Sequence, residues 1–78
     1  MTTREQVLAI LKEVKPTKNL ENVTDIIEKG YIDSFELMSL VASLSEKFGI
    51  EITIEELIPE NFNSVEAITK MVDAIKKD

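Results

Sequence analysis

The segment from Asp33 to Gly49 constrains the fold more than any other part of the chain, because it contains a helix with both its start and its end. Asp33 is a good N-cap, since its carboxylate can accept the free backbone N–H groups of a first helical turn. Glu36 follows three residues later and completes a capping-box pattern. Gly49 suits the left-handed conformation that closes a helix. We therefore predict a helix over residues 34–48, with the hydroxyl of Ser34 facing water on its first turn.

Apolar residues recur in this segment at helical spacing and form an unusually wide face. The main face comprises Leu37, Leu40, Val41, Leu44 and Phe48, and it is widened by Phe35, Met38 and Ala42. One neighbouring helix cannot cover so much apolar surface. We therefore expect helix 34–48 to be the most buried element.

A second amphipathic helix is predicted over residues 4–15. Thr3 and Gln6 form a Thr-x-x-Gln capping box at its start. Its apolar face comprises Val7, Ile10, Leu11 and Val14. Pro16 disfavours helix at the residue before it, so we expect the helix to end there.

Residues 16–32 contain turn formers and apolar residues without a long periodic pattern. The apolar residues are Leu20, Val23, Ile26, Ile27 and Ile32. A long unstructured loop is uncommon in a small domain, so we expect these side chains to anchor an ordered crossover. One helical turn is predicted near residues 24–28.

Residues 50–54 alternate between apolar and polar, as a strand would, but no second segment pairs with them. We therefore predict an extended connector. Thr53 and Glu56 can cap a short helix over residues 54–58, which Pro59 limits. Residues 59–62 are predicted to form a turn with Phe62 buried.

The last helix is predicted to begin after Asn63 or Ser64, with Glu66 as the capping-box partner of Asn63. Its buried stripe comprises Val65, Ile68, Val72 and Ile75, with Met71 alongside. These elements predict a single domain over residues 1–78. Its fold class is all-α: a four-helix bundle of three longer helices and one short helix, with a long ordered loop between the first two.

Composition excludes several classes of function. The chain of 78 residues has no cysteine and no histidine, so disulfides and the common zinc sites are excluded, and we expect no metal. The net charge of −6 disfavours nucleic acid and anionic membranes as partners. No apolar segment is long enough to predict membrane insertion, so the cytoplasm is the expected location.

The segment Asp33-Ser34-Phe35-Glu36, followed by apolar residues to Phe48, resembles the Asp-Ser-Leu segment of acyl and peptidyl carrier proteins. The resemblance extends to the free-standing members of this phosphopantetheine-binding family through residues 30–34, 48–52 and 61–65. It implies that Ser34 carries 4′-phosphopantetheine, attached covalently from coenzyme A by a phosphopantetheinyl transferase. It also implies the arrangement of helices predicted above.

The resemblance implies a carrier that holds acyl groups as thioesters and delivers them to enzymes of fatty-acid, polyketide or related biosynthesis. Its partners would be a loading ligase and downstream acyl-processing enzymes. Fatty-acid carriers usually have several acids on the second helix, whereas this chain has Ser39, Ser45 and Lys47, and Phe35 replaces the usual leucine. These departures favour the alternative of an aminoacyl or D-alanyl carrier.

We predict that the chain is not an enzyme, because it has no histidine base, no cysteine nucleophile and no glycine-rich phosphate loop. We also expect a monomer. Partner recognition is assigned to the residues around the serine and on the acidic edge that follows the second helix. They are Asp33, Phe35, Glu36, Met38, Ser39, Val41, Ala42, Glu55 and Glu56.

Several of these residues have a second interpretation. Asp33 can serve as a helix cap, as a recognition residue for the transferase, or as both. Met38 and Val41 can belong to the core, and Glu55 and Glu56 can be a solvated acidic edge. Leu40, Leu44, Ile58, Phe62 and Ile68 can line an acyl-chain shelter or simply pack the core.

Two other functional classes remain open. A small acidic helical inhibitor of the immunity type would have similar length and charge. Such a protein needs an aromatic hot spot, and this chain has only one tyrosine and no tryptophan. A carrier-like interaction module that is never modified is the third possibility.

Overall fold

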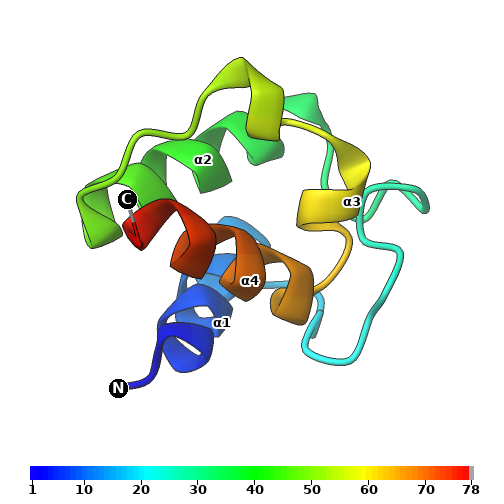
Figure 1. Ribbon diagram of the computed structural model, residues 1–78. Helices are drawn as coiled ribbons and strands as arrows, with labels where there is room; N and C mark the ends of the chain where they lie inside the picture. Colours follow the sequence, from blue (N-terminus) through cyan, green and yellow to red (C-terminus); the bar gives the residue numbers. More distant parts are fainter. Residues whose placement is uncertain (78) are drawn as a thin grey trace.

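The computed structural model describes residues 1–77, which fold into helices without any β-strand in that range (Figure 1). Three longer helices are α1 (Thr3–Val14), α2 (Ser34–Phe48) and α4 (Val65–Lys76). Between α2 and α4 lie a short 3₁₀ helix, η1 (Ile54–Glu56), and the single-turn α3 (Pro59–Phe62). The predicted all-α bundle, with its long loop between the first two helices, is confirmed.

The start of α1 differs from the prediction. Thr2 is the N-cap, and its hydroxyl accepts a hydrogen bond from the Glu5 N–H at 3.1 Å. The Glu5 carboxylate accepts one from the Thr2 N–H at 2.8 Å, and this bonding lowers the pKa of Glu5. The capping box is therefore Thr2–Glu5 instead of Thr3–Gln6. A carboxylate suits the positive end of a helix better than the neutral amide of Gln6 does.

The core lies where α1, α2 and α4 meet, and it extends beneath the crossover. α1 packs against α2 and α4, and α3 packs against α4. Its buried side chains are Val7, Ile10, Leu11, Leu20, Ile26, Ile32, Leu40, Leu44, Phe62, Val65, Ile68, Met71 and Val72. This set confirms three residues of the predicted face of α1, four of the predicted stripe of α4, and three of the predicted crossover anchors. Val14 and Ile75 are only half-buried.

The prediction that α2 would be the most buried helix is wrong. α4 buries four side chains, Val65, Ile68, Met71 and Val72, whereas α2 buries only Leu40 and Leu44. The reason lies in the packing, because α4 contacts both α1 and α3, while α2 packs mainly against α1. One side of α2 therefore remains in water.

Residues 50–53 form a connector that is neither helix nor strand, and Thr53 at its end has extended backbone angles. The Thr53–Glu56 capping box is confirmed. The helix that it starts is shorter than predicted, since η1 ends at Glu56 instead of Ile58. Residues 59–62 form a helical turn instead of an irregular one. Pro59 occupies the first helical position, where its fixed φ is favourable and its missing N–H costs nothing.

Ser64 is the N-cap of α4, and its hydroxyl accepts from the Ala67 N–H at 3.0 Å. The predicted Asn63–Glu66 capping box does not form. The Asn63 side chain is directed to the crossover instead, and the Glu66 carboxylate contacts Arg4, with an N–O distance of 2.7 Å.

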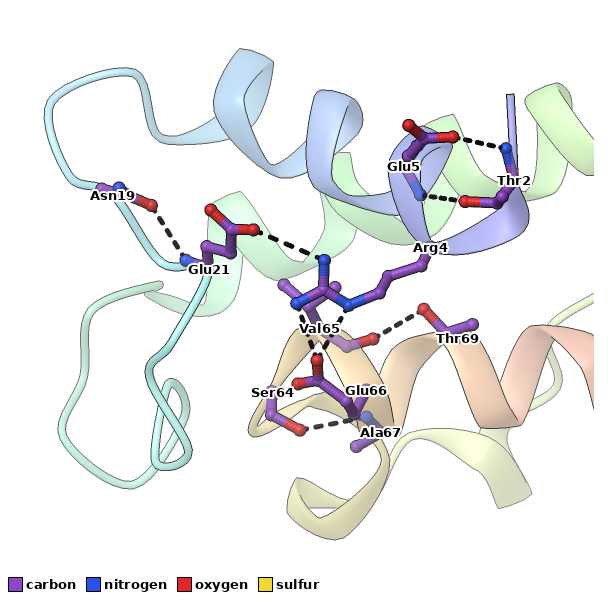
Figure 2. A network of polar contacts seen from close by, with 10 residues as sticks. All are labelled: Thr2, Arg4, Glu5, Asn19, Glu21, Ser64, Val65, Glu66, Ala67 and Thr69. Atoms are coloured by element: carbon purple, nitrogen blue, oxygen red, sulfur yellow. Dashed lines mark hydrogen bonds and ion pairs between the residues drawn. The ribbon is translucent and has the colours of Figure 1, made fainter.

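Besides its buried side chains, the crossover makes polar contacts with the rest of the described bundle at two places. Figure 2 shows the Arg4 guanidinium between Glu21 of the crossover and Glu66 of α4, at 3.4 Å and 2.7 Å. The second place is the α3–α4 junction, where Figure 1 shows the crossover beside α3 and where the Ile26 N–H donates to the Asn63 carbonyl. A helical turn is present, closed by the Lys29 N–H and the Asp25 carbonyl at 2.9 Å, one residue later than predicted.

No helix within residues 1–77 is long and apolar enough to cross a membrane. Over the same range, no group of three acidic residues is placed to hold a metal ion.

Candidate functional site

Ser34 is the first residue of α2, and its side chain is exposed, as predicted. Asp33 before it has extended backbone angles, φ −85° and ψ −179°, so the chain changes direction at this point. Ile32 is buried beneath the turn, with 4% of its surface exposed. The buried anchor fixes the chain from inside, and the serine hydroxyl is therefore presented to solvent at the mouth of the helix.

The predicted capping box at this helix start is confirmed. The Asp33 carboxylate accepts from the Glu36 N–H at 2.8 Å, and the Glu36 carboxylate accepts from the Asp33 N–H at 3.0 Å. The Lys15 ammonium at the end of α1 lies 3.3 Å from the second oxygen of Glu36. Glu36 is thus engaged within the protein, and Asp33 is the more accessible of the two acids.

An exposed stripe of α2 begins next to Ser34. Phe35, Met38, Ser39 and Ala42 are all exposed, at the i, i+3, i+4, i+7 spacing of one helical face. Phe35 is 80% exposed and Met38 is 55% exposed. Phe35, Met38 and Ala42 are the residues that were predicted to widen the buried face of the helix. The structure places them instead, together with Ser39, on one solvent-facing stripe, hereafter the α2 stripe.

The remaining candidate recognition residues, Val41, Glu55 and Glu56, differ in exposure and in their contacts within the protein. Val41 is half-buried against the core, so it contributes little free surface. Glu55 is exposed in η1. Glu56 caps η1 by accepting from the Thr53 N–H at 2.8 Å, and hydrogen bonds from Thr53 lower the pKa of this carboxyl. Glu55 takes no part in this cap, so its carboxylate is the more available of the two for a partner.

Sequence reasoning missed two exposed apolar residues. Ile54 is 82% exposed and Ile58 is 44% exposed. The alternating pattern places Ile50, Ile52 and Ile54 on one side of an extended chain, but η1 begins at Ile54 and turns its side chain outward. The Thr53–Glu56 capping box was the available signal, because it identifies Ile54 as the first residue of a helix.

The predicted shelter for an acyl chain does not form a cavity here. Leu40, Leu44, Phe62 and Ile68 are at most 1% exposed and belong to the packed core, and Ile58 lies at the surface. A shallow groove of about 450 Å³ does lie beside the helix start, between α1 and α2. Glu13, Asp33 and Glu36 contribute carboxylates to its lining. These negative charges disfavour a phosphodiester inside the groove.

The residues around Ser34 suit the attachment of a phosphopantetheine arm. The arm requires an accessible hydroxyl, and the Ser34 side chain is exposed. Free N–H groups of the first turn and the positive end of the α2 dipole favour a phosphate at this position. The nearby acids oppose it, so the covalent bond must hold the arm in place.

The profile of the family described as "Phosphopantetheine attachment site" matches residues 5–72. The D-alanyl carrier protein of Listeria welshimeri is 30% identical over 78 residues, covering 97% of this chain and 100% of the relative. That of Listeria monocytogenes serotype 4b gives the same figures. The D-alanyl carrier protein of Bacillus cereus strain B4264 is 29% identical over 75 residues, covering 94% of this chain and 95% of the relative.

These matches favour a carrier over an inhibitor of the immunity type. They also favour the aminoacyl alternative over the fatty-acid or polyketide delivery predicted first. The family match covers most of α1, all of α2 and most of α4, and it implies a covalent 4′-phosphopantetheine group. The chain belongs to the family of carrier proteins with a phosphopantetheine attachment site.

Proposed function

We propose that this protein is a non-enzymatic aminoacyl carrier of the D-alanyl type, with Ser34 as the attachment point of 4′-phosphopantetheine. The observation that carries the proposal is the exposed serine at the capped start of α2, inside the region matched by the attachment-site family. The protein would act as a single carrier domain over residues 1–78, as a monomer. It would act in the cytoplasm, where coenzyme A is available.

The modification needs a separate phosphopantetheinyl transferase, because the chain has no histidine or cysteine to activate Ser34. The serine oxygen forms a bond to the pantetheine-bearing phosphorus of coenzyme A, and the P–O bond within the diphosphate breaks. Adenosine 3′,5′-bisphosphate leaves, and a base on the transferase takes the hydroxyl proton. The product carries a thiol at the end of a flexible arm.

A loading ligase would then attach the cargo to this thiol as a thioester. Tethering raises the effective concentration of the cargo at the next enzyme, since the carrier delivers it without release into bulk solution. The similarity to D-alanyl carrier proteins supports an alanyl cargo.

The α2 stripe, with Ile54 and Glu55 of η1, is the proposed recognition surface. Exposed apolar side chains such as Phe35, Met38 and Ile54 supply burial energy on docking. Asp33 and Glu55 add charges that guide the approach of a basic partner. Glu36, Val41 and Glu56 would act mainly by holding the helices in place, because their side chains are engaged within the protein.

The attachment site is tested by incubating the unmodified protein with coenzyme A and a transferase of broad specificity, followed by intact mass measurement. We expect the mass gain of one phosphopantetheine in the wild type and none in Ser34→Ala. Ser45→Ala, a change at a half-buried serine of α2 outside the α2 stripe, serves as the control and should be modified normally. A folded wild type that gains no mass would overturn the proposal.

The cargo is tested on the modified protein with ATP and two ligases, one that activates D-alanine and one that activates a fatty acid. We expect an alanyl mass gain that hydroxylamine removes, because a thioester is labile to it. Loading by the fatty-acid ligase alone would favour the acyl carrier instead.

A further inference from the structure

Asn63 forms an unusual set of contacts for a residue between two helices. Its side-chain oxygen accepts hydrogen bonds from the Ile27 N–H at 2.9 Å and the Glu28 N–H at 3.3 Å. Its backbone carbonyl accepts a third from the Ile26 N–H at 3.0 Å. One residue at the α3–α4 junction thus holds three consecutive amides of the crossover, far away in the sequence.

Further backbone hydrogen bonds connect residues 26 and 27 to the residues shortly before Ser34. The Tyr31 N–H donates to the Ile26 carbonyl at 3.0 Å, and the Gly30 N–H donates to the Ile27 carbonyl at 3.0 Å. The turn over residues 26–31 is therefore closed on itself, and it is connected to the bundle through Asn63. Residues 32 and 33 then lead directly into α2.

Apolar burial alone does not fix the orientation of this turn. Ile26 and Ile32 are buried. The hydrophobic effect is non-directional, so their burial keeps the turn against the core but does not set the rotation of the turn relative to the helices. Hydrogen bonds are directional, with strong preferences in distance and angle. The Asn63 contacts are therefore the ones that orient the turn relative to the bundle.

The helix that follows Asn63 does not need its side chain. Ser64 caps α4 through the Ala67 N–H, so the Asn63 amide has no capping task there. Asn61, two residues earlier, also uses its side chain on a backbone group, donating to the Glu56 carbonyl at 2.9 Å. It stays within the η1–α3 region and serves as a matched comparison.

We propose that Asn63 is a positioning residue for the modification of Ser34. It holds the turn over residues 26–31 so that the segment before Ser34 meets the transferase in one orientation. The proposal rests on the proposed function, in which Ser34 is the attachment point. Without the side-chain acceptor, the turn samples other orientations, and the fraction of molecules ready for modification falls.

The test compares Asn63→Leu, which has similar size and no acceptor, with Asn63→Asp, which keeps an acceptor oxygen. Asn61→Ala is the control. Amide hydrogen exchange at Ile27 and Glu28 reports the contact directly, and kcat/KM of the transferase, from intact mass time courses, reports its effect on Ser34. If Asn63→Leu does not fold, Asn63→Ala removes the same acceptor with less bulk.

We expect Asn63→Leu to speed exchange at both amides and to lower kcat/KM by roughly tenfold, on the scale of losing two hydrogen bonds. Asn63→Asp should restore both measurements, and Asn61→Ala should leave both near wild type. Faster exchange with unchanged kcat/KM would overturn the positioning role, as would an Asn63→Asp variant modified as slowly as Asn63→Leu. A wild type that is never modified would overturn the proposed function itself, while the exchange data would still report the contact.

Discussion

Phe35 and Phe62 offer a comparison of the same substitution in two environments. Phe35 is 80% exposed and Phe62 is 1% exposed. A phenylalanine side chain presents roughly 200 Å² of surface, so Phe35 buries about 40 Å² on folding. At about 25 cal/mol per Å², Phe35→Ala should lower the free energy of unfolding by at most about 1 kcal/mol.

Phe62→Ala should cost much more. Removing a buried phenylalanine typically lowers the free energy of unfolding by about 3–5 kcal/mol, because a cavity remains. That range equals the whole stability of about 3–5 kcal/mol expected for a domain of this size. We therefore expect Phe62→Ala to be largely unfolded and Phe35→Ala to be folded, as measured by urea denaturation followed by circular dichroism.

Phe35→Ala, although it stays folded, should strongly lower the rate of loading. Phe35 exposes about 160 Å² next to Ser34, and a partner that covers half of it gains about 2 kcal/mol. Phe35→Ala should then lower kcat/KM for loading of the modified protein by roughly 30-fold. The assay is an intact mass time course with D-alanine, ATP and a low concentration of the ligase.

Lys70→Ala, an exposed change on α4 outside the α2 stripe, is the control and should load normally. Phe35→Ala that loads at the wild-type rate would refute the docking role of the stripe. Phe35→Ala that is as unstable as Phe62→Ala would refute the assignment of this side chain to solvent.

Three further predictions concern stability. Asp33→Ala removes the acceptor of the Glu36 N–H and should lower the free energy of unfolding by about 0.5–2 kcal/mol in urea denaturation; an unchanged midpoint would contradict the capping role. Gly49→Ala should cost about 1–2 kcal/mol in the same assay, because φ is 63° there and the added methyl group meets no atom within 4 Å, so backbone strain alone acts. The hydrogen bond from Arg4 lowers the pKa of Glu66, so this contact stabilises the protein above about pH 4.5 and is lost as the pH falls through the lowered pKa. Arg4→Gln should therefore flatten the dependence of Tm on pH in the acid range. An unchanged slope would count against the ion pair.

Local patterns predicted α2 and its cap almost to the residue. The groups that decide a cap lie within three or four residues of one another, as Asp33 and Glu36 do, so their contacts form whatever the rest of the chain does. The same reasoning failed at α1, where two overlapping capping boxes fit the sequence. Only the contacts at Thr2 and Glu5 show which box forms.

The position of Ser34 was predictable for the same reason, but its surroundings were not. Phe35 and Met38 belong by spacing to a wide apolar face, and nothing in the pattern says which part of that face a neighbour will cover. The packing of α1 against a single side of α2 decides it. Asn63 was one of two candidate caps because its spacing to Glu66 fits a capping box, whereas its actual partners lie in the crossover, far away in the sequence.

The sequence by itself determined both ends of α2, the approximate extent of α1 and α4, and which serine stands exposed at a helix start. Short-range hydrogen bonds and helical periodicity are sufficient for that. The tertiary structure alone decided which apolar residues face water, that the core is closed, and that the crossover is held by Asn63. These properties depend on contacts between residues distant in the sequence, and such contacts exist only once the helices have packed.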